Sequence, residues 1–118
     1  MTPDFGGVHD ELRAIMLRHA GGMVVSRDLP GDLVVRTQAL DPKTGEPGWF
    51  GAVTVKKSYA AYHLMPLYER PELADGLSPA LVRRRQGKTC FNFKRPDADL
   101  FVELDALTRR AALALKAG

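Results

Sequence analysis

The sequence predicts a single α+β domain, built as a two-layer sandwich with terminal helices packed on one face of a sheet. Three observations predict this class. Apolar residues recur at helical spacing in the first and last segments. The segments between them alternate apolar and polar residues or are rich in valine and aromatic residues. Short turns join the first four of these predicted strand segments, which is typical of antiparallel strands. The expected order is α-β-β-β-β-(α)-α-β-α, with about five mostly antiparallel strands.

Size and charge limit the class of protein. A chain of 118 residues with 45% hydrophobic and 26% charged residues suits one domain over residues 1–118 that buries its own core. The 17 Lys and Arg against 14 Asp and Glu give a net charge of +3, which permits anionic partners without requiring them. A single cysteine excludes an internal disulfide framework. With no signal-peptide pattern and no apolar stretch of bilayer length, we expect a cytoplasmic protein that does not contact membranes.

The first predicted element is an amphipathic helix. Val8, Leu12 and Ile15 recur along one face, and charged residues occupy the other. Gly21 and Gly22 are expected to end this helix, because glycine readily adopts the left-handed conformation that closes many helices.

A β-hairpin is predicted next. Two valine-rich segments, 23–28 and 33–38, flank Pro30 and Gly31. Proline presets φ and glycine accepts positive φ, so this dipeptide fits the centre of a type II turn. The following residues, 41–48, contain two prolines and two glycines and no apolar side chain, which predicts an exposed loop.

The centre of the sheet is predicted within residues 49–68, which hold the only tryptophan and all three tyrosines. Two strands are expected to fold back on each other at 56–58. The second strand, 59–65, is apolar on both faces, which is typical of a central strand or of one covered by helices or by a partner subunit. A homodimer is one way to provide that cover. Pro66 is expected to end the strand, because proline cannot donate to the ladder.

Short helices are predicted after this strand. Residues 67–76 read as a turn and a short helix. Ser78 and Pro79 match the N-cap and first position of a further helix, with Gly87 placed to close it after about two turns.

A strand and a long helix complete the chain. In the strand at 88–94, two phenylalanines point one way and Cys90 and Asn92 the other. The last helix is expected to begin at Asp97 and run nearly to the end. Its apolar stripe comprises Leu100, Phe101, Leu104, Leu107, Ala111 and Leu115, and its cations gather late, where the helix dipole favours them.

Three stretches resemble a known family: VKKSYAAYHLMPLYERPEL, SPALVRRRQGKTCFNF and DADLFVELDALTRRA. Together they resemble small bacterial proteins of the YdhG-like domain-of-unknown-function group, over residues 51–111. The resemblance implies a compact α+β domain and, for some relatives, a proposed frataxin-like role in iron handling. It supplies no catalytic residues. This sequence departs from an iron-carrying pattern, since the last helix offers only four acids, Asp97, Asp99, Glu103 and Asp105.

A ligand site is predicted where polar side chains meet on the sheet. Its candidate residues are Tyr59, His63, Cys90 and Asn92, with Lys57 and Lys88 beside them. Nearby cations would lower the pKa of the thiol and favour thiolate. The alternatives are a hydrogen-bonded structural histidine and a cysteine that acts as a small buried hydrophobe. A dyad of His63 and Cys90 requires their strands to be neighbours, which the sequence does not establish.

No complete catalytic, metal or cofactor signature is present, so we expect a binding or interaction module for a small molecule or a protein rather than an enzyme. The second hypothesis is nucleic-acid or phosphate binding through a basic surface, with Tyr59, Tyr62 or Phe91 stacking on bases. The third is a small cysteine-dependent enzyme. The basic residues are Lys56, Lys57, Arg83, Arg84, Arg85, Lys88, Lys94 and Arg95.

Overall fold

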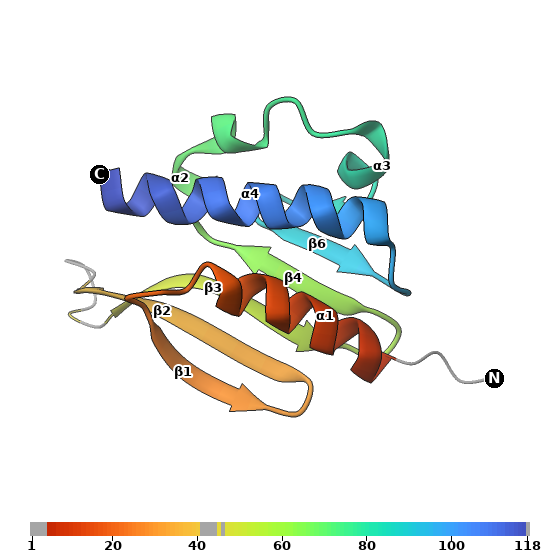
Figure 1. The fold of residues 1–118 in the computed structure, drawn as a ribbon, viewed down its shortest axis with the longest axis horizontal. Coiled ribbons are helices and arrows are strands. Elements are labelled where there is room, and N and C mark those ends of the chain that lie inside the picture. Colours follow the sequence, from red (N-terminus) through yellow and green to blue (C-terminus); the bar gives the residue numbers. More distant parts are fainter. Residues whose placement is uncertain (1–4, 41–44, 46, 118) are drawn as a thin grey trace.

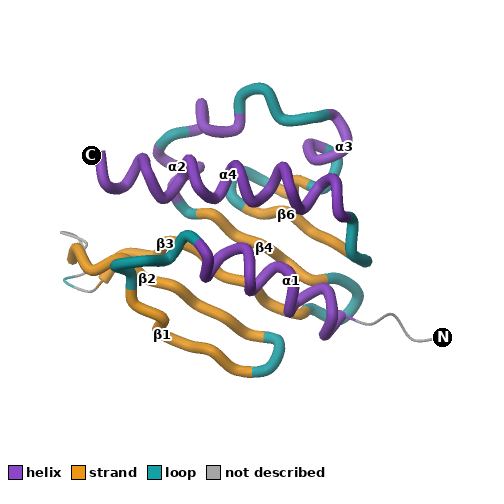
Figure 2. The backbone as a smooth tube through the Cα atoms, in the orientation of Figure 1, coloured by secondary structure: helices purple, strands orange, loops and turns teal. Residues whose placement is uncertain are grey.

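The computed structural model describes residues 5–40, 45 and 47–117, which form a six-stranded sheet with two long helices on one face (Figures 1 and 2). This confirms the predicted α+β class and its two layers. In chain order the elements are α1 (Phe5–Arg18), β1 (Val24–Leu29), β2 (Asp32–Leu40), β3 (Pro47–Val55), β4 (Ala60–Leu64), α2 (Pro66–Glu69), η1 (Pro71–Ala74), α3 (Pro79–Val82), β5 (Arg85–Gln86), β6 (Cys90–Phe93) and α4 (Ala98–Ala117).

The strand order in the sheet is β1-β2-β3-β4-β6-β5, and every neighbouring pair is antiparallel. β4 lies between β3 and β6, as its apolar character on both faces predicts. The chain leaves the sheet after β4 and returns at β5, so that β6 is inserted next to β4. Residues far apart in the sequence are thereby brought side by side.

The first hairpin is confirmed. Gly31 has a φ of 76° in the turn between β1 and β2, which is the conformation that the Pro-Gly pair predicts. Of the loop expected at 41–48, residues 41–44 and 46 lie outside the described residues. Its last two residues belong to β3, which begins at Pro47, so the predicted loop is too long at that end.

The core lies between the sheet and the two long helices. Tyr62 is fully buried beneath α4, and its hydroxyl lies 2.7 Å from Oγ1 of Thr108. The Thr108 hydroxyl also donates to the Leu104 carbonyl, so the proton between Tyr62 and Thr108 comes from the tyrosine. At Gly51 a Cβ atom would lie 2.5 Å from Met16 Cε and from the His63 carbonyl oxygen. Only glycine therefore lets α1 approach the sheet so closely.

The segment around the three arginines differs from the prediction. α3 ends at Val82 after a single turn, and the chain then forms the short strand β5. The backbone N–H of Asn92 donates to the Arg84 carbonyl at 2.8 Å, so pairing with β6 takes the place of a second helical turn. Gly87, with a φ of 75°, belongs to the turn between β5 and β6 instead of closing a helix.

α4 begins as predicted. Asp97 caps it by accepting a hydrogen bond from the Leu100 N–H at 3.2 Å. Glu103 joins α4 to the segment before α3, because its carboxylate accepts hydrogen bonds from the N–H and the hydroxyl of Ser78, each at 2.6 Å. In the part of the chain that the structure describes, no helix is long and apolar enough to cross a membrane.

Candidate functional site

His63 and Cys90 lie side by side on neighbouring strands. They face each other in the register of β4 and β6, and His63 Nε2 lies 3.7 Å from Cys90 Sγ. Their side chains point away from α1 and α4, because the alternate residues, such as Tyr62, point into the core beneath those helices (Figure 1). The spatial adjacency that a dyad requires is therefore present in the structure.

The protonation of this pair differs from the prediction. Burial raises the pKa of the Cys90 thiol, and the opposing effect of Lys56 does not overcome it. Burial also lowers the pKa of His63, with a further contribution from Lys56. The thiol donates to Asn92 Oδ1 at 3.2 Å. Near neutral pH the pair is therefore a neutral thiol beside a neutral imidazole, and not the thiolate that nearby cations were expected to favour.

The other predicted members of the site lie further out. Lys57 is exposed and Tyr59 half-buried in the turn between β3 and β4. Lys88 belongs to the turn between β5 and β6, where its Nζ lies 5.1 Å from the centre of the Tyr68 ring. The structure thus brings together His63, Cys90 and Asn92 from the predicted set. The cation that influences the pKa values of His63 and Cys90 is Lys56. The alternation along β3 places Lys56 on the same face as Thr54, whose cross-strand partner is Ala61.

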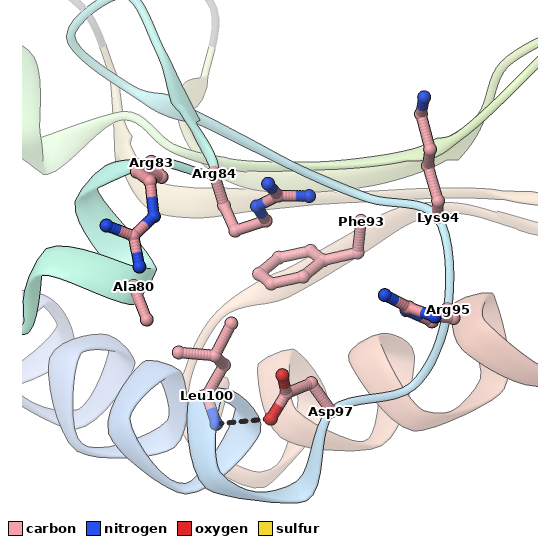
Figure 3. Close-up of a pocket in the computed structure, with 8 residues that line it drawn as sticks. All are labelled: Ala80, Arg83, Arg84, Phe93, Lys94, Arg95, Asp97 and Leu100. Carbon is pink, nitrogen blue, oxygen red and sulfur yellow. Dashed lines mark hydrogen bonds between the residues drawn. The ribbon is translucent and has the colours of Figure 1, made fainter.

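A second region is a hollow of about 420 Å³ between α3, the end of β6 and the start of α4 (Figure 3). This volume suits a small organic ligand. Basic residues line it from two directions, Arg83 and Arg84 from the end of α3, and Lys94 and Arg95 from the connection after β6. The remaining lining residues are Ala80, Phe93, Asp97 and Leu100.

The charge around the hollow is unbalanced. Four basic residues line it, against the single carboxylate of Asp97, and the ammonium of Lys94 points away from the other lining side chains (Figure 3). The ion pairs among the described residues join Arg13 to Asp28, Arg18 to Asp105, and Arg27 to Asp32, so none of them involves these four basic residues. One oxygen of Asp97 already accepts the capping hydrogen bond of α4. The hollow therefore presents an excess of positive charge, with Asp97 as the one acidic residue among its lining residues.

The floor of the hollow is apolar and fixed. Phe93 is buried and packs edge-on against Phe101, with 5.1 Å between ring centres. Leu100 adds a further buried side chain. Because the Arg84 backbone is hydrogen-bonded to β6, the cations extend from a backbone that the sheet holds in place.

The predicted basic surface is only partly assembled. Arg83 and Arg84 line the hollow, whereas Arg85 turns back to donate to the Lys88 carbonyl at 2.7 Å. Tyr62 and Phe91 were expected to stack on bases, and this is wrong, because both are fully buried in the core. The sequence shows the cations, but not that α3 and the β6–α4 connection converge on one hollow.

Two acids of α4, Glu103 and Asp105, have structural partners. Glu103 binds Ser78, and Asp105 pairs with Arg18 and His19. Among the described residues, no group of three or more His, Cys, Asp or Glu side chains could hold a metal ion. The iron handling that the resemblance implies thus has no ligand cluster to support it in the described part of the chain.

Comparison with known proteins assigns neither region. No protein-family model, curated protein or solved structure matches the chain. The resemblance to the YdhG-like group stays a hypothesis, and function has to be inferred from the side chains of these two regions.

Proposed function

We propose that this protein binds a phosphate-bearing ligand in the hollow between α3 and the start of α4. The observation that carries the proposal is the set of four basic residues around one hollow, none of which takes part in an ion pair within the described part of the chain. Like charges held close together repel each other, and an anion placed between them removes that repulsion. Arginine also offers a planar fork of N–H donors that matches the oxygens of a phosphate.

The balance of charges favours phosphate over a lone carboxylate. Three arginines and one carboxylate leave an excess of two positive charges, without counting Lys94, whose ammonium points away. A phosphate monoester or a diphosphate supplies two or more negative charges and several acceptor oxygens, whereas a carboxylate supplies one charge. The apolar floor at Phe93 and Leu100 can accommodate an uncharged part of the same ligand.

Binding is proposed here, and not turnover. The lining of the hollow contains no cysteine, serine or histidine, and its one carboxylate caps α4. A binding protein with one free cysteine suits the cytoplasm, where thiols stay reduced, and we propose that location.

The test is a titration with pyrophosphate at low salt. Calorimetry measures the binding, and thermal unfolding measures the gain in stability. The variant R83E/R84E reverses two exposed charges at the hollow. The control R70E/R109E makes the same change in net charge at exposed positions that do not line the hollow. We expect pyrophosphate to raise the stability of the wild type and of the control, by about 2.7 kcal/mol at a concentration 100 times the Kd, and not that of R83E/R84E. Equal binding by all three proteins would contradict the proposal.

A second candidate is a ligand site on the sheet face that bears His63, Cys90 and Asn92. The specific observation is that an imidazole, a thiol and an amide lie together on the face turned away from α1 and α4. Since burial keeps the thiol and the imidazole neutral, such a site would hydrogen-bond an uncharged ligand. In a screen of metabolites, a compound that raises the unfolding temperature of the wild type and not that of H63A/C90A would support this site. Stabilisation that survives both substitutions would exclude it.

A further inference from the structure

Basic side chains continue beyond the hollow, along the same end of the sheet. Lys56 and Lys57 are exposed in the turn between β3 and β4. Ala60, just after this turn, pairs with Phe93, so the turn lies beside the end of β6, which Lys94 follows in the chain (Figure 1). The Lys56 N–H donates to the Tyr59 carbonyl at 2.7 Å, which fixes the turn. The resulting row of cations, which we call the basic row, passes around the end of the sheet, from the hollow on the helix side to Lys56 on the opposite face. It comprises Arg83, Arg84, Lys94, Arg95, Lys56 and Lys57.

The basic row is longer than one phosphate group needs. Lys56 and Lys57 precede β4, and Lys94 and Arg95 follow its neighbour β6. Neighbouring strands lie about 4.8 Å apart, so the backbones that carry these two pairs are separated by about that distance. A single small anion in the hollow would leave Lys56 and Lys57 without a counter-charge, since none of the ion pairs of the described residues includes them. In DNA, by contrast, charges recur about every 3.4 Å of the helix axis along each strand.

The aromatic side chains near the basic row cannot serve as stacking platforms. Tyr62, Phe91 and Phe93 are buried, and Tyr59 is only half exposed. Proteins that bind single strands usually stack bases on exposed aromatic rings. Without such rings, the contacts that remain are those of Lys and Arg with phosphates, which position a nucleic acid without reading its sequence.

We infer that the phosphate-bearing partner is a nucleic-acid duplex whose backbone follows the basic row from the hollow to the β3–β4 turn. This inference rests on the proposed function and names its partner. The hollow receives one phosphate, and the two lysines of the turn contact the phosphates that follow along the same backbone. Duplex is preferred to single strand because its charge density is higher and no stacking is required.

The test measures fluorescence anisotropy with a 16-base-pair duplex of mixed sequence and with a single strand of the same length, between 50 and 200 mM salt. The expected slope of log K against log salt is about −3 to −5, because up to six phosphates are neutralised at about 0.9 each. We expect tighter binding of the duplex than of the single strand, and no effect of changing the duplex sequence.

Two variants separate the inference from the proposed function. K56E/K57E should lower duplex affinity at least tenfold and make the salt slope shallower by about two, while pyrophosphate binding stays unchanged. R83E/R84E should abolish both kinds of binding, and R70E/R109E should lower duplex affinity less than K56E/K57E does. If pyrophosphate binds normally but K56E/K57E and the control affect duplex binding equally, the inference fails and the proposed function stands. If neither pyrophosphate nor duplex binds, both fail. Binding to vesicles rich in anionic lipid with no duplex binding would also overturn the inference.

Discussion

The cationic hollow and the His63–Cys90 pair both depend on β6, yet they differ in whether their polar groups already have partners. The Cys90 thiol donates to Asn92 and lies against His63, and burial keeps both titratable groups uncharged. None of the arginines and lysines around the hollow takes part in an ion pair among the residues that the structure describes. The proposed ligand site therefore rests on unbalanced charge, and not on the presence of reactive residue types.

The comparison is tested most strongly by reversing charge at the hollow. K94E/R95E should weaken pyrophosphate binding by about 30-fold or more, because two attractive charges become repulsive next to the anion. H63A/C90A should leave the same Kd within about twofold, since that pair lies outside the hollow. Calorimetric titration of both variants measures the contrast. A large loss in H63A/C90A would show that the two regions act as one site.

The reactivity of Cys90 gives the next largest effect. Because burial raises the pKa of its thiol, alkylation by iodoacetamide at pH 7 should be slower than that of a small free thiol, and its rate should keep rising as the pH is raised past 9. Lys56→Gln should slow it further, because Lys56 is the cation that lowers this pKa. Mass spectrometry of quenched samples follows the reaction. Fast alkylation at pH 7 would restore the cysteine-dependent enzyme as a hypothesis.

A smaller effect is expected in the dependence of stability on pH. The pKa of His63 is lower in the folded protein than its ordinary value of 6.5, so the unfolded chain binds the proton first as the pH falls. His63 should therefore reduce stability as the pH drops through about 6.5 and toward its folded pKa. Urea unfolding at pH 8 and pH 5 should show a larger loss for the wild type than for His63→Gln. Parallel losses in both proteins would mean that His63 is not the group responsible.

The smallest effect concerns Asn92. Its side chain accepts only the weak S–H donor of Cys90 among the contacts described, so Asn92→Ala should lower the free energy of unfolding by no more than about 1 kcal/mol. Pyrophosphate binding should not change. Chemical denaturation and the same titration check both statements. A loss of several kcal/mol would mean that the pair on the sheet supports the fold much more than its hydrogen bonds suggest.

Local periodicity predicted much of the fold and part of the candidate site. Alternation along residues 88–94 correctly placed Cys90 and Asn92 on one face, opposite Phe91 and Phe93. The helical stripe and its capping aspartate correctly placed the start of α4. Each of these patterns depends on neighbours within a few residues, which a sequence displays directly.

The parts that the sequence did not predict depend on contacts between distant segments. The signal for the start of α3 at Ser78 was correct, but Gly87 misled, because glycine with positive φ serves hairpin turns as well as helix ends. The pairing of β6 with Arg84 decided which of the two occurred. The hollow is equally non-local, since its cations come from two segments separated by the whole of β6.

The two hydrogen bonds between Ser78 and Glu103 indicate where residues can be inserted into this protein. Ser78 is held twice by that carboxylate and also accepts from the Leu81 N–H, so the return path to β5 is anchored immediately before the arginines. Residues 70–76 precede this anchor, and most of them are exposed. A tag or a few extra residues inserted there should leave the arginines where they are, which offers a place to attach a fluorophore without disturbing the ligand it reports on.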